Sequence, residues 1–273
     1  MRIPPSKMSF VKYILIAKNT LQEYFVYRVN FFFWRLQVFI FFVMFFSLWS
    51  AVSAGQSKLG DYSIPQIYSY FVIGYIIKAF VFATRTQDIG GDIQNGNFST
   101  LLIKPISTLK YYFSRDMIDK LFNLFFMFWE FLLILFLFKP TLALPTTQNF
   151  IIFLLFLVLS IITFFFYSLV VSFIAFWSED AWSSRFLFGV VFVTIFSGQY
   201  IPLDFLPPII GKILDYTPYP YMFYYPLKIW LGQLDPSMAY LRLLNGSIIC
   251  LFFFILSQFM WLKGKQKYQS YGN

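Results

Sequence analysis

The chain has 273 residues, of which 59% are hydrophobic and 24% aromatic but only 12% charged. A soluble domain is usually about 25% charged, so this composition excludes an ordinary soluble fold and indicates a polytopic membrane protein. The formal net charge is +9, but the basic residues gather at the ends of apolar runs and form no stripe that would suit nucleic acid.

The N-terminal residues 8–29 are predicted to form an amphipathic helix that lies in the membrane interface. Ile14, Leu15 and Leu21 recur at roughly helical spacing, while Lys12 and Lys18 mark a polar side. A charged face opposite an apolar face is typical of helices that lie on a membrane. The alternative is that this segment is the solvated start of the first span.

Six further runs are apolar and long enough to be transmembrane helices. They are residues 31–52, 64–84, 121–138, 150–177, 185–201 and 246–262. With both termini in the cytoplasm, fifteen Lys and Arg residues lie inside, five lie outside and one, Lys78, lies within a span. Because cytoplasmic loops collect basic residues, this excess predicts that both ends of the chain are cytoplasmic.

Residues 203–245 are apolar but contain six prolines, too many for a straight span. Non-helical backbone at membrane depth must be surrounded by protein or water. We therefore expect two half-helices that form a re-entrant hairpin on the outer side of a single membrane domain, residues 1–273. The alternative is an external loop that packs on the membrane surface.

Residues 85–120 form a basic, polar insert between two apolar runs and are expected in the cytoplasm. Phe98, Leu101 and Leu102 give a short helix an apolar face. Lys104 precedes Pro105 and should end that helix, because a residue before proline avoids the helical region. The insert therefore predicts a partly apolar helix held across the cytoplasmic end of the bundle.

No phosphate-binding loop is found. The spacing GxxxxG occurs at residues 55–60 and 91–96, but Asp61 and Asn97 follow instead of the Lys and Ser/Thr that a P-loop requires. If ATP drives this protein, another chain must bind the nucleotide.

Two segments resemble the membrane subunits of type-2 ABC exporters. Residues 92–107, DIQNGNFSTLLIKPIS, resemble the segment after the second span of that family, which has an acidic residue, Gly-x-apolar, a Leu-Leu pair and a proline followed by apolar-Ser. Residues 197–207, SGQYIPLDFLP, and 219–232, YPYMFYYPLKIWLG, resemble its late pattern of a small-residue pair, Pro-Leu, Leu-Pro and a proline-to-glycine stretch. The order of the spans is also similar.

The resemblance implies a permease subunit of an ATP-binding-cassette exporter in a bacterial inner membrane. Two such subunits, identical or similar, would face each other across the translocation path. Separate ATPase subunits would bind ATP and magnesium beneath them, so this chain would have no catalytic site. The residues that the resemblance assigns to ATPase coupling are Asp92, Gly96, Phe98, Leu101, Leu102, Lys104 and Pro105, with Glu179 and Asp180 as a smaller contact.

Two charges lie within predicted spans, Lys78 and Glu130. Ionisable residues at membrane depth are costly, so they are usually paired or functional. We expect Lys78 and Glu130 either to neutralise each other or to line the substrate path. Arg35 lies in the first turns of its span, where its long side chain is expected to snorkel to the headgroups.

Aromatic residues are expected mainly to pack or to face lipid, but three residues are candidates for the substrate path: Gln199, Tyr200 and Tyr224. The family that these segments resemble is expected to have a bulkier apolar or aromatic residue at the position of Gln199. This departure from the pattern leaves the character of the substrate open. Drug, lipid, peptide and polysaccharide exporters can share this architecture.

Other classes of protein remain as alternatives. A secondary transporter would show two related halves, and no internal repeat is seen. An integral-membrane enzyme acting on lipid-linked substrates would need a polar catalytic cluster. The chain has no histidine, so only the carboxylate pairs Asp88/Asp92 and Asp116/Asp119 could serve. A structural scaffold would leave the polar insert unexplained.

Overall fold

The computed structural model describes residues 5–268, with side chains from residue 11 onward. Arg2, which we counted among the cytoplasmic charges, lies outside the described residues. The expectation of an all-α membrane protein is confirmed, since the only strands described are the two-residue partners of one antiparallel hairpin. The long elements are α1 (Pro5–Val26), α2 (Arg28–Ser53), α3 (Ile64–Val81), α6 (Thr108–Phe138), α7 (Thr147–Phe173) and α13 (Pro236–Lys267), and the hairpin pairs β1 (Lys58–Leu59) with β2 (Tyr62–Ser63).

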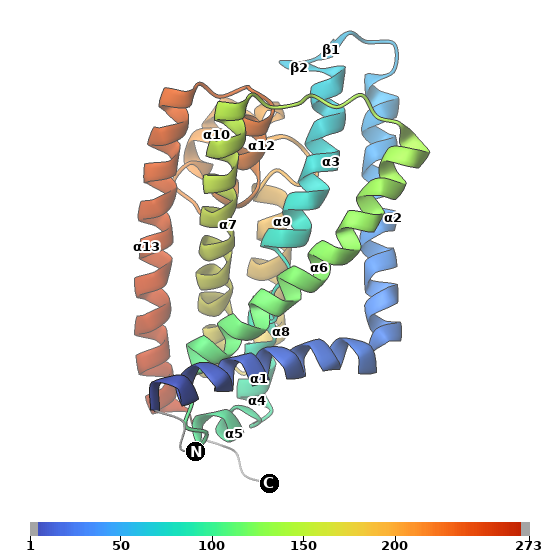
Figure 1. The fold of residues 1–273 in the computed structure, drawn as a ribbon. Coiled ribbons are helices and arrows are strands. Elements are labelled where there is room, and N and C mark those ends of the chain that lie inside the picture. Colours follow the sequence, from blue (N-terminus) through green and yellow to red (C-terminus); the bar gives the residue numbers. More distant parts are fainter. Residues whose placement is uncertain (1–4, 269–273) are drawn as a thin grey trace.

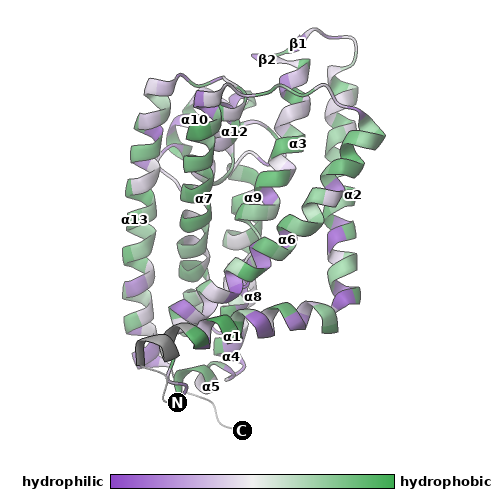
Figure 2. Ribbon diagram, viewed as in Figure 1, coloured by the Kyte–Doolittle hydropathy of each residue, from purple (hydrophilic) through white to green (hydrophobic). Residues whose placement is uncertain are grey.

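Five described helices are long and apolar enough to cross a membrane, namely α2, α3, α6, α7 with its 3₁₀ extension to Phe176, and α13. They stand side by side as a bundle, with α1 lying across one end (Figure 1). We call this the α1 end. Apolar residues dominate the long helices, and hydrophilic residues are more frequent along α1 and near the helix ends (Figure 2). The bundle therefore has the polarity that a bilayer requires.

The N-terminal helix forms as predicted, although α1 ends at Val26 and α2 begins at Arg28. It packs on α6 and leaves Ile14, Leu15 and Phe25 exposed. Apolar side chains on the open face of a helix that lies across the bundle suit a position in the membrane interface.

The predicted fifth span, residues 185–201, differs in the structure. An apolar helix extends from Ala181 to Phe196, built from α8 (Ala181–Ser184), a π-helical stretch (Arg185–Phe192) and α9 (Val193–Phe196). At 1.5 Å per residue it is at most about 24 Å long, less than the roughly 30 Å of a bilayer core. The helix ends before Gly198, whose φ of +88° turns the chain.

The proline-rich segment is packed into the bundle. It contains α10 (Pro208–Leu214), α11 (Tyr219–Met222) and α12 (Tyr224–Trp230), but its last ten residues belong to α13, which begins at Pro236. The predicted boundary at residue 245 was therefore wrong. Tyr221, Leu227 and Ile229 are fully buried in the main core, which argues against a loop that only covers the surface.

The main hydrophobic core lies around α3. Val72 and Ile77 of this helix are fully buried, and α2, α6, α7 and α12 all contact it. A smaller, separate core lies at the α1 end, and this is where the insert after α3 is attached.

Candidate functional site

The insert after α3 folds into a compact cap at the α1 end. Its short helices are α4 (Ile89–Gln94) and α5 (Phe98–Leu102). Phe98 lies edge-on to Phe176 and Trp261, with ring centroids 5.8 and 5.7 Å apart. Leu101 is buried in the same small core. The cap therefore packs on α7 and α13 through apolar contacts and is not a solvated loop.

The predicted apolar face of α5 divides into two parts. Phe98 and Leu101 point into the protein, whereas Leu102 is 39% exposed and the next residue, Ile103, is 84% exposed. Lys104 and Pro105 are also exposed. We call residues 102–105 the α5 tip. Apolar residues gathered on an exposed surface often mark an interaction site, and Ile103 was missing from the predicted coupling residues.

Gly96 makes the bend between α4 and α5, where its φ is +75°. The hydroxyls of Ser99 and Tyr268 donate hydrogen bonds to the Gly96 carbonyl oxygen at 2.6 and 3.1 Å. A positive φ favours glycine, so Gly96 shapes the cap. Asp92 on α4 is half-buried; burial, followed by the charge of Asp88, raises the pKa of its carboxyl.

The Glu179–Asp180 turn lies beside the cap. The Gln94 side-chain amide of α4 donates hydrogen bonds to the backbone carbonyls of Ser178, at 3.3 Å, and of Glu179. Asp180 accepts a hydrogen bond from the Ser183 backbone N–H at 2.9 Å and caps α8, and its bonds to Ser183 lower the pKa of its carboxyl. The structure thus brings both predicted contact regions to one end of the bundle, and it gives Asp180 a local structural role.

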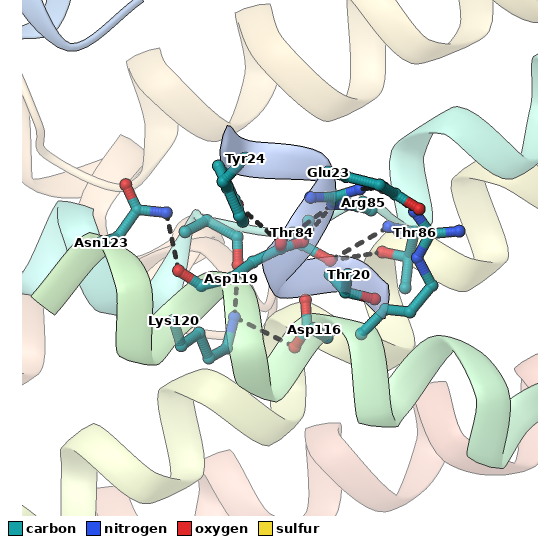
Figure 3. A network of polar contacts seen from close by, with 12 residues as sticks. Thr20, Glu23, Tyr24, Thr84, Arg85, Thr86, Asp116, Asp119, Lys120 and Asn123 are labelled. Carbon is teal, nitrogen blue, oxygen red and sulfur yellow. Dashed lines mark hydrogen bonds and ion pairs between the residues drawn. The ribbon is translucent and has the colours of Figure 1, made fainter. Parts of the chain in front are cut away.

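An ion-pair network joins α1 to the helices of the bundle (Figure 3). Arg85, just after α3, pairs with Glu23 of α1, and its Nε donates to both carboxylate oxygens of Asp119 of α6 at 2.9 and 2.8 Å. The Tyr24 hydroxyl donates to Asp119 at 2.6 Å, and Arg115 donates to Glu23 at 2.5 Å. One guanidinium therefore ties three elements together, a role that the sequence did not indicate.

A second contact at the same level connects α3 and α6. Lys120 is buried, lies 3.1 Å from the Asp116 carboxylate and donates a hydrogen bond to the Ala83 carbonyl at 2.6 Å. Asp116 and Asp119 each have a cationic partner, so these two carboxylates serve in structural ion pairs.

Glu130 pairs with Arg35 and not with Lys78, so the predicted partner was wrong. The Arg35 Nε donates to Glu130 Oε1 at 2.8 Å, and its Nη1 donates to Asn123 Oδ1 at 3.0 Å. The Tyr75 hydroxyl also donates to Glu130. The side chain of Arg35 is only 5% exposed, so the expectation that it snorkels to the headgroups was also wrong: it faces α3 and α6 inside the bundle.

A cleft opens between α2, α3 and the helix Ala181–Phe196. Lys78, Gln199 and Tyr200 all line it, so the structure brings together two of the three predicted path residues. The Tyr200 ring stacks on Phe45 with centroids 4.2 Å apart. Tyr224 lies elsewhere: its hydroxyl donates to Asp204 at 2.6 Å, and it lines a different pocket.

One comparison with known proteins gives a family. A model of the family described as ABC-2 family transporter protein matches residues 32–272. No curated protein and no solved structure matches the chain.

Proposed function

The chain belongs to the ABC-2 family of transporter membrane proteins, and we propose that it is an export permease that separate ATPase subunits drive through the α1 end. A membrane protein of this family is a permease subunit of an ABC transporter, without a nucleotide-binding site of its own. ATP and magnesium would bind on the partner ATPase.

The observation that supports ATPase docking is the α5 tip. It exposes Leu102 and Ile103 next to Lys104, while Phe98 and Leu101 of the same short segment are buried. An apolar pair with a charged rim is the composition of many protein interfaces. The exposed Glu179 lies on the neighbouring turn and would enlarge the contact.

The contacts of the cap provide a route from the ATPase to the spans. A force on the α5 tip reaches α7 and α13 through Phe98 and Leu101. The helix α6 starts directly after the tip, at Thr108, and is joined to α1 and to the end of α3 through Arg85. Because packed interiors are stiff, closure of the ATPases would move these helices together.

The same proposal places the protein in the membrane. The basic α1 end would face the cytoplasm of a bacterial inner membrane. The helix Ala181–Phe196, lengthened by the turn at residues 197–200, would cross the membrane in addition to the five long helices and so bring the number of crossings to six. Residues 203–235 would re-enter the bilayer from the far side. A second permease chain, the same or similar, would cover the cleft between α2, α3 and this helix, with lipid around the pair.

Co-purification in detergent with a candidate ATPase tests the proposal. Ile103→Asp places a charge on the exposed tip and should abolish capture of the ATPase without unfolding the permease. Leu144→Asp is the matched control, because Leu144 is 82% exposed in the loop between α6 and α7, at the opposite end of the bundle (Figure 1). Leu101→Asp is unsuitable, since Leu101 is buried and the change would damage the fold.

Each result decides between specific alternatives. Capture that survives Ile103→Asp would move the coupling surface away from the α5 tip, first to α1 and the Glu179–Asp180 turn. If the folded wild-type chain captures no ATPase at all, coupling to a separate ATPase is wrong, and transport driven by an ion gradient becomes the better hypothesis.

A further inference from the structure

Lys78 is a charged residue of α3 that has no carboxylate partner among the described residues. Glu130 pairs with Arg35 instead, and no acidic side chain in the described part of the chain lies within 4.0 Å of the Lys78 ammonium. The Lys78 Nζ lies over the Tyr200 ring, 6.0 Å from its centroid. An ammonium at membrane depth is costly unless something neutralises it.

The surroundings of Lys78 define a site with two different parts. A neighbouring pocket, which shares Lys78 and Tyr200 with the cleft, is lined by aromatic rings, including Phe41 and Phe45 of α2 and Phe71 of α3. None of the residues around Lys78 in the cleft is acidic, and the other cation there, Arg35, is already neutralised by Glu130. A single free positive charge thus stands next to an apolar wall.

The wall and the turn near Lys78 are held by packing. Phe45 stacks on Tyr200 with an interplanar angle of 6°, and the Trp49 Nε1 donates to the Tyr200 carbonyl at 3.1 Å. The Tyr70 hydroxyl donates to the Gly198 carbonyl at 2.7 Å. These contacts fix the aromatic surface before any ligand arrives, which lowers the entropy cost of binding.

We propose that this cleft binds an amphiphile with a hydrocarbon tail and one anionic group, whose anion pairs with Lys78 and whose tail lies on the aromatic wall. The inference rests on the permease function and names the class of its substrate. A carboxylate, sulfate or phosphate monoester neutralises the ammonium where water is scarce, and apolar pockets with a few placed polar groups are typical ligand sites. A polyanion does not suit a site with one free cation, and a neutral amphiphile leaves Lys78 uncompensated.

The test measures binding to the purified permease alone, in nanodiscs of phosphatidylcholine. Trp34 lines the cleft, so its fluorescence should be quenched by a dibrominated stearate, and Trp34→Phe identifies its share of the signal. The methyl ester of the same lipid lacks only the charge, and butyrate is the anion with a short tail. Lys78→Met removes the charge at similar length, Lys78→Arg retains it, and Lys58→Met is a charge control in the hairpin at the far end.

We expect stearate to bind the wild type at least tenfold more tightly than Lys78→Met, with Lys78→Arg and Lys58→Met close to wild type. The ester should bind wild type and Lys78→Met equally, and butyrate should compete poorly. Equal stearate affinity in wild type and Lys78→Met would overturn the inference. Full competition by butyrate would also overturn it, because the site would then take a small free anion.

A third arm tests whether side chains of the second copy, which covers the cleft in the proposed dimer, fill the site in place of a ligand. If Lys78 is protected from an amine-reactive reagent only in the dimer, and stearate changes nothing, then the partner subunit and not an amphiphile occupies the site, and the inference fails. No ATPase is present in these measurements, so a negative result here leaves the ATPase-capture experiment unaffected, and the reverse also holds.

Discussion

The buried pair Arg35–Glu130 allows a quantitative prediction about stability. The two side chains are 5% and 17% exposed, so solvent screens them little. Glu130→Gln keeps the shape but leaves the Arg35 guanidinium buried without a counter-charge. Breaking a buried ion pair by removing one partner typically costs about 3–5 kcal/mol, and we expect Glu130→Gln and Arg35→Met each to lower the free energy of unfolding by about that amount.

The double variant Arg35→Met/Glu130→Gln should be much less damaged than the sum of the two single variants. Its remaining cost is the loss of hydrogen bonds to Asn123 and Tyr75, about 1–3 kcal/mol in total. Replacing both members of a buried pair is often close to neutral. The coupling energy should therefore be at least about 2 kcal/mol, above the roughly 0.6–1.7 kcal/mol measured for hydrogen bonds between membrane helices.

The assay is reversible unfolding of the purified permease in mixed micelles with increasing dodecyl sulfate, followed by circular dichroism. A double variant whose loss equals the sum of the single losses would refute the pairing. Charge reversal tests separately whether Arg35 or Lys78 is the partner of Glu130. The double variant Arg35→Glu/Glu130→Arg should regain part of the stability that a single reversal removes. The double variant Lys78→Glu/Glu130→Lys should not, because Lys78 is not the partner of Glu130.

Two further predictions concern the end of the bundle opposite α1. Gly198→Ala should destabilise the fold by about 1–3 kcal/mol, seen as a lower Tm, because φ is +88° and the new Cβ would lie 2.8 Å from the Tyr70 hydroxyl; an unchanged Tm would contradict the strained turn. Burial disfavours the Asp204 carboxylate, but hydrogen bonds from Tyr224 and Tyr62 and the charge of Lys228 outweigh it and lower the pKa of Asp204. Since the folded pKa is below the unfolded value of about 3.9, this carboxylate stabilises the protein above that pH, and the stabilisation is lost as the pH falls through the folded pKa. Asp204→Asn should therefore lower the Tm at pH 7 and weaken its dependence on acid pH, and an unaltered acid profile would show that Asp204 does not contribute.

The local pattern of the sequence predicted the features that depend on composition alone. Long apolar runs become membrane helices because unpaired backbone groups are too costly in lipid, and five of the six predicted spans correspond to long apolar helices. Pro105 follows α5 closely, as its chemistry requires. The motifs at residues 92–107 and 197–232 led to the family that the family model confirms.

Only the tertiary structure decided which side chains meet. Glu130 faces Arg35 of α2 because of how these helices are rotated about their axes, and no local pattern encodes that rotation. The same holds for the α5 segment, where Leu101 is buried and Ile103 is exposed, since the small core at α7 and α13 fixes which residues point inward. The cleft beside Lys78 likewise depends on where α2 and α3 lie relative to the helix Ala181–Phe196, which is distant from them in sequence. Spacing along one helix predicts a shared face, whereas the partner of that face depends on the packing of the whole bundle.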